Sequence, residues 1–399
     1  MSFTKEQIEN YADVMLWGLW TARPKFKPYE LIFVRTDIAA LPLAEAIHRR
    51  LIERKMNVIV RTQPVPGIER DFFMRSDPRQ RKYIAPGEKE LTSALNGLIA
   101  VIAPESLTHL KEVDPKRLAE VAVARKPLKD INTRREEKKQ FGWTLCLYPT
   151  LEPARTARLS PKAYTEQIAK ACFLDDPDPV ARWESIHEEC NELKKWLNAL
   201  PVETFHLESK SMDLEIRLGE KRRFLGIDGC NIPSFEIFTS PDWRGTRGVF
   251  FADLPSFRQG NYVEKMRVEF AGGKAVKVTA EMGEEFARKM VGMDPGAARV
   301  GELSLTDTRF SKIDRFMANT LFDENFGGRF GNCHIALGSS YTATFTGNPG
   351  LLTKAAKDRL GYNDSSLHWD IINTENKVVT AHLKGGKKVK IYEKGRFQH

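Results

Sequence analysis

Acidic side chains in apolar surroundings recur in the second half of the chain. Glu236 lies in an apolar segment with the character of a strand, and Glu302 stands between a glycine and a leucine. Glu324 is the second of two adjacent acids that follow Leu321 and Phe322. Burying a carboxylate costs free energy unless it is paired or binds a cation. These three glutamates are therefore candidate metal ligands.

Two histidines extend the pattern. His334 begins an apolar run that ends at Gly338, and His368 precedes Asp370 by two residues. Side chains two residues apart point to the same face of an extended strand. Carboxylates and imidazoles together form a mixed oxygen and nitrogen ligand set. Such a set suits zinc, cobalt or manganese, and it favours a paired site over a closed structural one.

Each of these residues also has an ordinary structural interpretation. A single glutamate beside apolar residues is more often an edge or salt-bridged acid, and a single histidine is more often a hydrogen-bonded core residue. A histidine and an aspartate two residues apart occur often by chance. The metal-site interpretation depends on the clustering of several such cases within residues 230–370.

The sequence lacks the motifs of several other enzyme classes. His187 and Glu188 begin like the helical zinc-protease motif, but Asn191 stands where the second histidine would be. No phosphate-binding P-loop is present, no GxGxxG follows the first predicted strand, and no GxSxG occurs. The sequence thus shows neither a nucleotide-binding fingerprint nor a serine-hydrolase elbow.

The elements that must position these residues fall into two groups, of which the first alternates strands with helices. Short apolar runs predict buried strands, and apolar residues at helical spacing predict helices. This alternation indicates an α/β layer with a largely parallel sheet. The strands are expected at residues 31–34, 58–60, 98–103 and 143–148, and the main helices at residues 5–19, 43–55, 115–140 and 179–200.

The second group begins after Pro201 and is richer in strands. The expected fold is an α/β N-terminal domain over residues 1–210 and a β-rich α+β C-terminal metal-binding domain over residues 211–399. A helix is expected near residues 284–290. The predicted strands of this half are residues 212–218, 224–227, 249–251, 263–270 and 276–279.

Composition indicates a globular protein in a reducing compartment. The 399 residues are 41% hydrophobic, and the formal net charge is +9. The densest basic run, Arg134–Lys139, mixes both signs, so a nucleic-acid partner is not expected. Five cysteines without a CxxC pair argue against a disulfide framework. We find no apolar run of the roughly 18 residues that a membrane span needs and no signal peptide, so a cytoplasmic location is expected.

Five short segments occur in a specific order and carry a resemblance to a known family. Together with the α/β first half, they resemble the thermophilic-type metallo-aminopeptidases, the family of aminopeptidase T, aminopeptidase S and PepS. The resemblance covers essentially the whole chain. The segments are Asn231–Pro241, Val300–Leu303, Thr320–Asn325, His334–Gly338 with the nearby Tyr341, and His368–Asp370.

The resemblance implies two cocatalytic divalent ions (zinc, cobalt, manganese or magnesium) in a homodimer that removes N-terminal amino acids from peptides. It implies Glu302 as the bridge between the ions. Glu324 matches an acid that is a ligand or the general base, and Tyr341 matches a tyrosine near the metals. Glycines between Glu324 and His334 permit positive-φ turns that bring Glu324 to the metals. The remaining implied ligands are Glu236, His334, His368 and Asp370.

Other functions stay open from the sequence alone. A different dinuclear-metal hydrolase, such as an amidase, a deacetylase or a phosphoesterase, would use the same ligands. No cluster of arginines and lysines lies beside the motifs to hold a phosphate, which argues against the phosphoesterase. A basic nucleic-acid-binding protein with a structural metal site would be retained on heparin without peptidase activity. The full set of six candidate ligands argues against a metal-free paralogue.

Overall fold

The computed structural model describes residues 3–399 and contains two compact units. The first comprises residues 3–183 together with Asp228–Pro233, and the second comprises Glu184–Ile227 and Ser234–His399. Helix α9 (Pro179–Ala199) leads the chain into the second unit. Among residues 3–399, none of the helices combines the length and the hydropathy of a membrane-spanning segment.

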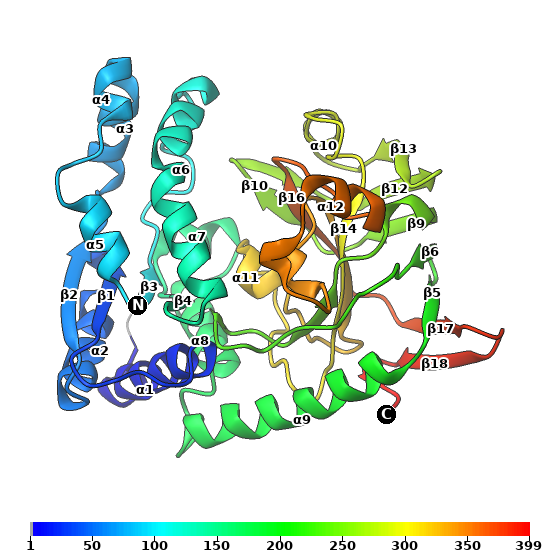
Figure 1. Cartoon of the computed structure of the whole chain (residues 1–399), viewed down its shortest axis with the longest axis horizontal. Helices are drawn as coiled ribbons and strands as arrows, with labels where there is room; N and C mark the ends of the chain where they lie inside the picture. Colours follow the sequence, from blue (N-terminus) through cyan, green and yellow to red (C-terminus); the bar gives the residue numbers. More distant parts are fainter. Residues whose placement is uncertain (1–2) are drawn as a thin grey trace. The chain divides into compact units, whose positions relative to one another are not determined.

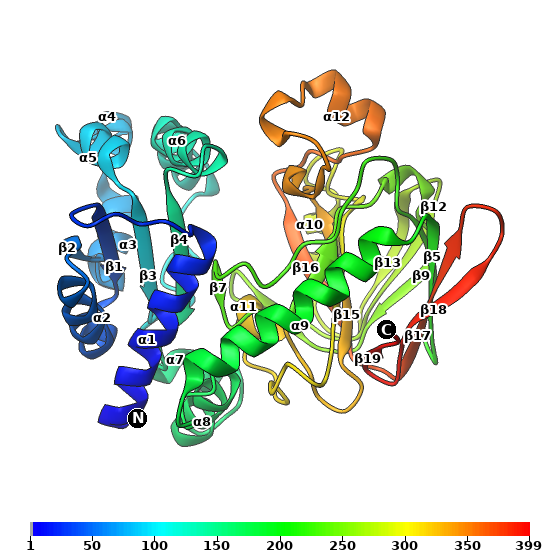
Figure 2. The ribbon, with the colours of Figure 1, turned by 60° about the horizontal axis from the view of Figure 1, so that its bottom comes forward.

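The first unit is built on a parallel sheet of five strands in the order β2-β1-β3-β4-β7, of which Figure 1 labels the first four and Figure 2 also labels β7. This sheet confirms the predicted α/β layer. The last strand is not predicted, because it comes from the short segment that returns from the second half of the chain. The strands are β1 (Leu31–Thr36), β2 (Asn57–Thr62), β3 (Gly97–Ile102), β4 (Gly142–Leu147) and β7 (Asn231–Ile232).

The helices of the first unit begin at residues that favour helix starts. The hydroxyl groups of Thr4 and Ser160 cap α1 and α8, and Asp77 caps α4. Helix α1 packs against α2 and strand β4 (Figure 2). The helices are α1 (Lys5–Ala22), α2 (Leu41–Glu53), α3 (Pro66–Arg75), α4 (Pro78–Lys82), α5 (Glu88–Ala94), α6 (Pro115–Glu137), α7 (Leu151–Thr156) and α8 (Pro161–Ala171).

The second unit is rich in antiparallel strands, as predicted. Its larger sheet has the order β13-β12-β9-β6-β5-β17-β18-β19. Its helices besides α9 are α10 (Glu284–Val291), α11 (Thr320–Asp323) and α12 (Lys354–Leu360). The strands of the larger sheet are β5 (Val202–Ser209), β6 (Asp213–Arg217), β9 (Arg247–Ala252), β12 (Met266–Ala271), β13 (Lys274–Thr279), β17 (Lys377–Leu383), β18 (Lys388–Glu393) and β19 (Arg396–Phe397).

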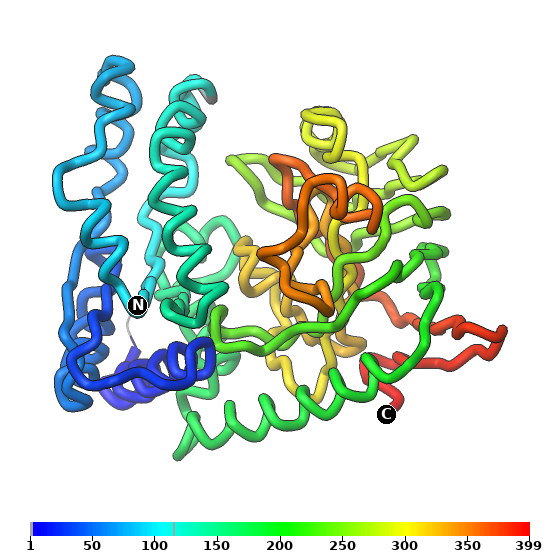
Figure 3. The backbone as a smooth tube through the Cα atoms, viewed as in Figure 1, coloured from blue at the N-terminus to red at the C-terminus, as the bar shows by residue number. Residues whose placement is uncertain are grey.

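A smaller antiparallel sheet of the second unit has the order β16-β15-β14-β8. Strands β14 and β15 are buried along their whole length, so polar side chains on them are enclosed by protein. These strands pair although loops and helices separate them in the chain, and the changing colour of the backbone trace shows how far apart in sequence they lie (Figure 3). The strands are β8 (Glu236–Thr239), β14 (Val300–Thr306), β15 (Asn332–Gly338) and β16 (His368–Asn373).

Two predicted strands of this half are wrong in detail. Residues 224–227 form only an isolated bridge at Leu225, because polar side chains of α9 take their backbone groups. Asn198 binds both backbone groups of Phe224, and Lys194 donates to the Gly226 carbonyl. The predicted strand 263–270 is broken after β11 (Asn261–Val263), where Lys265 has a φ of +48° before β12 begins.

Candidate metal centre

The candidate ligands project from all four strands of the smaller sheet. Glu236 begins β8, Glu302 lies in β14, His334 in β15, and His368 and Asp370 in β16. Their positions in the register put them on one face. Residues that lie opposite each other in an antiparallel pair share a face of the sheet, and so do residues two apart along one strand. The opposite pairs that connect the ligands are Glu236 with Thr306, Ser304 with His334, and Ala336 with Asp370.

His334 lies at the centre of this group. Its Nε2 atom is 3.3 Å from Oε2 of Glu236 and 3.4 Å from Oε1 of Glu302. Glu236, Glu302 and His334 form a possible metal-binding group, because their ligand atoms all lie within 4.8 Å of one another. Among residues 3–399 it is the only group of three or more His, Cys, Asp or Glu side chains that meets this limit. Asp370 continues the group, with Oδ1 3.9 Å from Nε2 of His334 and 3.4 Å from Nε2 of His368. The structure therefore brings five sequence-predicted ligands together.

Hydrogen bonds orient both imidazole rings toward the carboxylates. Nδ1 of His368 donates to the Ser339 carbonyl at 3.0 Å. The side-chain amide of Asn332 donates to the carbonyls of Glu324 and Phe326, which leaves its Oδ1 atom facing Nδ1 of His334 at 3.4 Å. In the neutral form of each ring these contacts place the proton on Nδ1, and the lone pair on Nε2 then faces the site. This is the arrangement in which histidine binds a metal ion.

The site concentrates negative charge in a buried space. Glu302 is 3% exposed and His334 is completely buried. Burial raises the pKa of Glu302, and the nearby charge of Glu236 raises it further. Burial alone lowers the pKa of His334, but the carboxylates of Glu236 and Glu302 reverse this effect and raise it. Both shifts have the same cause: negative charges held close together in a buried space favour the binding of a proton or another cation.

A divalent cation fits these residues. Oε2 of Glu302 is buried and has no hydrogen-bond partner among the described residues, and it lies 3.9 Å from Nε2 of His368. In the same range, no lysine or arginine forms an ion pair with Glu236, Glu302, Glu324 or Asp370. A buried carboxylate oxygen without a partner is costly. Carboxylate and imidazole donors suit zinc, cobalt and manganese.

Glu324 lies beside the other ligands but is held differently. It follows α11, and its Oε1 atom accepts a hydrogen bond of 3.5 Å from the side-chain amide of Asn325. Burial raises its pKa well above the ordinary value, and the charge of Glu236 adds to the rise. Among the described residues it forms no ion pair with the other candidate ligands. The expected positive-φ turns are present in the loop after it, at Gly328 and Gly331.

Tyr341 borders the same site. Its backbone N–H donates to the Ser240 hydroxyl at 2.8 Å, and its ring centre is 4.8 Å from that of His368. The residue is 47% exposed. Partial burial raises the pKa of its phenol, and the charge of Glu302 does the same. The phenol therefore stays protonated at neutral pH and is available as a hydrogen-bond donor.

Three residues of the site are missing from the sequence interpretation. The Ser304 hydroxyl donates to Oε2 of Glu236 at 3.2 Å. The guanidinium of Arg258 donates to the His368 carbonyl at 3.0 Å, and Asn332 orients His334. The alternation of Glu302 with Ser304 along β14 is a signal for a polar face. Nothing in the sequence places Arg258 here, because it reaches the site from a separate hairpin.

Asn332→Ala is expected to weaken metal binding by about 10- to 100-fold, the usual effect of losing a group that orients a ligand. Without the amide, His334 can place its proton on Nε2. Competition with a metal-sensitive dye, starting from the chelator-treated protein, measures the change. Asn198→Ala is the matched control, because Asn198 binds backbone groups of Phe224 instead of the site. Equal affinities in the two variants would contradict this role of Asn332.

The chain is similar in sequence and fold to known aminopeptidases. The chain is 32% identical over 269 residues to aminopeptidase T of Thermus aquaticus, an alignment that covers 64% of this chain and 63% of that one, just under two thirds of its length. It is 28% identical over 435 residues to aminopeptidase 2 of Geobacillus stearothermophilus, covering 100% of this chain and 99% of that one. The solved structure of wild-type AmpT from Thermus thermophilus has the same fold, with a TM-score of 0.80, 23% identity, and coverage of 98% of this chain and 99% of that one.

A family model gives the assignment. The model described as thermophilic metalloprotease (M29) matches residues 4–397, which is almost the full length of the chain. The family name specifies the use of a metal ion, and the buried cluster of carboxylates and imidazoles is chemically suited to bind one. The chain belongs to the thermophilic metalloprotease (M29) family.

Proposed function

We propose that this protein is a metal-dependent aminopeptidase that hydrolyses N-terminal amino acids from peptides. Membership of the M29 family supports the metal-dependent peptidase chemistry. The names of the relatives, aminopeptidase T and aminopeptidase 2, support cleavage after the N-terminal residue of the peptide. The single observation that carries the proposal is the position of Glu302. Its two carboxylate oxygens lie 3.4 Å and 3.9 Å from the Nε2 atoms of His334 and His368.

The proposed site holds two divalent ions. Glu302 is the proposed bridge, because each of its oxygens faces a different histidine. Glu324 is a ligand, the general base or both. The donor set is compatible with zinc, cobalt or manganese, and magnesium is the remaining candidate. The other proposed ligands are Glu236, His334, His368 and Asp370.

The proposed mechanism assigns separate tasks to the chain's own residues. Bound divalent ions would polarise the scissile carbonyl and make water acidic enough to ionise near neutral pH. Glu324 accepts the proton of the attacking water and passes it to the leaving amine. Tyr341 donates a hydrogen bond to the oxyanion of the tetrahedral intermediate, a contribution typically worth about 2.7–4 kcal/mol. The free α-amine of the peptide would be held by a metal ion or by a spare carboxylate of the site.

The decisive experiment combines metal analysis with an aminopeptidase assay. Purified protein is expected to contain two divalent ions per chain and to release p-nitroaniline from aminoacyl-p-nitroanilides. Treatment with a chelator should abolish release, and added metal should restore it. Release that is indifferent to chelation, or hydrolysis of phosphoesters but not of aminoacyl amides, would contradict the proposal. A homodimeric state and a cytoplasmic location stay predictions.

A further inference from the structure

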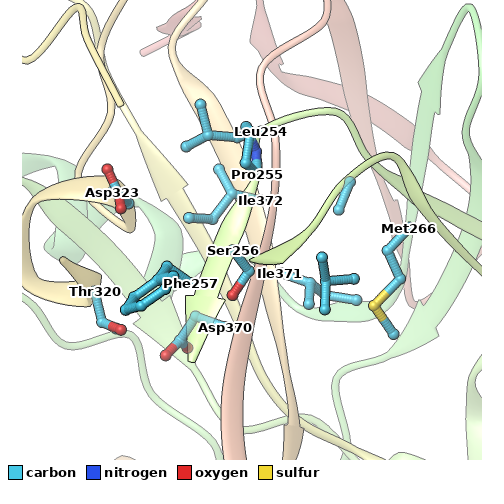
Figure 4. Close-up of a pocket in the computed structure, with 12 residues that line it drawn as sticks. Leu254, Pro255, Ser256, Phe257, Met266, Thr320, Asp323, Asp370, Ile371 and Ile372 are labelled. Carbon is cyan, nitrogen blue, oxygen red and sulfur yellow. The ribbon is translucent and has the colours of Figure 1, made fainter. Parts of the chain in front are cut away.

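A small cavity lies beside Asp370, on the strand that carries two candidate ligands. Its volume is about 20 Å³. It is bordered by β16, by α11 and by the hairpin of β10 (Ser256–Arg258) and β11 (Asn261–Val263). Figure 4 shows the aliphatic side chains of the lining and the carboxylate of Asp370 together. The lining residues that matter here are Leu254, Phe257, Met266, Thr320, Asp370 and Ile372.

The β10–β11 hairpin is attached to the metal-site strand on both sides of Phe257. The indole N–H of Trp369 donates to the Ser256 hydroxyl at 2.8 Å. On the other side, Arg258 donates to the His368 carbonyl at 3.0 Å. The ring of Phe257 is 4.9 Å from that of Tyr262 across the hairpin. These contacts hold Phe257 in place against the cavity.

The lining of the cavity is mixed: Asp370, Asp323, Ser256 and Thr320 border it together with aliphatic and aromatic side chains. Asp370 contributes its carboxylate to the candidate metal centre, 3.4 Å from Nε2 of His368. Ile372 follows on the same face of β16, because residues two apart along a strand share a face. The apolar lining therefore begins directly beside a metal-site carboxylate. A ligand with a polar head and a short apolar branch matches this arrangement.

We propose that this cavity is the subsite for the side chain of the N-terminal residue, and that Phe257 sets its size. The inference rests on the proposed aminopeptidase function. An amino acid whose amine and carbonyl lie at the carboxylates and histidines carries its side chain on the intervening Cα, next to the reacting groups. A cavity of about 20 Å³ is little more than the space one water molecule needs. The subsite therefore selects methyl-sized side chains, and alanine is its preferred residue.

The energetic consequence is a strong dependence on side-chain size. One additional methylene in a close-fitting apolar pocket typically changes kcat/KM by about 10- to 200-fold. Truncating Phe257 to alanine removes a wall of the cavity, so leucine and phenylalanine should enter. Such a gain for bulky substrates cannot come from misfolding, which lowers activity on every substrate together.

The test compares alanyl-, leucyl- and phenylalanyl-p-nitroanilide on the metal-loaded full chain. We expect the wild-type protein to favour alanine over leucine by at least about 10-fold, and Phe257→Ala to shift that ratio toward leucine by at least about 10-fold. Phe286→Ala is the matched control, since Phe286 is also half-buried and its ring is 6.2 Å from that of Trp369, but it does not line the cavity. An unchanged ratio in Phe257→Ala would overturn the inference.

A binding measurement separates this inference from the proposed function. Calorimetry with the product amino acids L-alanine and L-leucine reports the selectivity of the cavity even if no p-nitroanilide is hydrolysed. We expect Phe257→Ala to bind L-leucine more tightly relative to L-alanine than the wild-type protein does. Equal relative affinities in both proteins would show that the cavity holds only a structural water. Failure of hydrolysis with the expected binding shift would instead contradict the aminopeptidase assignment.

Discussion

Glu302→Gln is expected to lose one divalent ion and reduce turnover by more than about 100-fold, beyond the usual effect of changes around a ligand. Glu302 is 3% exposed, and its oxygens face His334 at 3.4 Å and His368 at 3.9 Å. A glutamine offers one neutral oxygen, and its NH₂ group would point at an imidazole lone pair or a cation. Metal analysis by mass spectrometry and the p-nitroanilide assay measure the two effects.

In the chelator-treated protein, Glu302→Gln should not reduce stability. Removing one charge from a cluster of like charges relieves repulsion, so the chelated variant should be at least as stable as the chelated wild type. The rise in melting temperature on adding metal should shrink, because the stabilisation by a ligand grows with the logarithm of its concentration divided by Kd, and the variant binds metal more weakly. Glu375→Gln is the control, since Glu375 accepts hydrogen bonds from Ser209 and Ser211 outside the site. A full metal content in Glu302→Gln would contradict the bridging role.

The sequence allowed much of the site to be predicted, because its chemistry is local. A carboxylate or histidine inside an apolar run is visible without a structure, as at Glu236, Glu302 and His334. Their closeness in space was harder to predict from the sequence, since it depends on the order of the strands in the sheet. The order β16-β15-β14-β8 and its register bring these side chains onto one face, and no local pattern specifies either. The resemblance to a known family supplied that information.

The features that were missed depend on contacts between distant segments. Residues 224–227 have the composition of a strand, but side chains of α9 occupy their backbone groups, so no ladder forms. Phe257 and Arg258 lie in a short hairpin whose sequence has no sign of catalysis. They reach the site because Trp369 and the His368 carbonyl bind the hairpin. Such tertiary contacts override local preference, and they decide what surrounds a reactive group.

Glu324→Gln separates general-base catalysis from metal binding. If Glu324 is the base, the variant should keep both ions, while kcat falls by about 10²–10⁴-fold, the usual contribution of a positioned acid or base. KM should change less, because the proton moves in the transition state.

The structure favours this outcome. Among the described residues, the Glu324 carboxylate forms no ion pair with His334 or His368, so its oxygens are not engaged by the histidines that would hold the ions. Its backbone is fixed through Asn332, so the amide substitution should leave the loop in place. Loss of one ion with recovery of activity in excess metal would identify Glu324 as a ligand instead, and turnover within a few-fold of the wild-type value would exclude both roles.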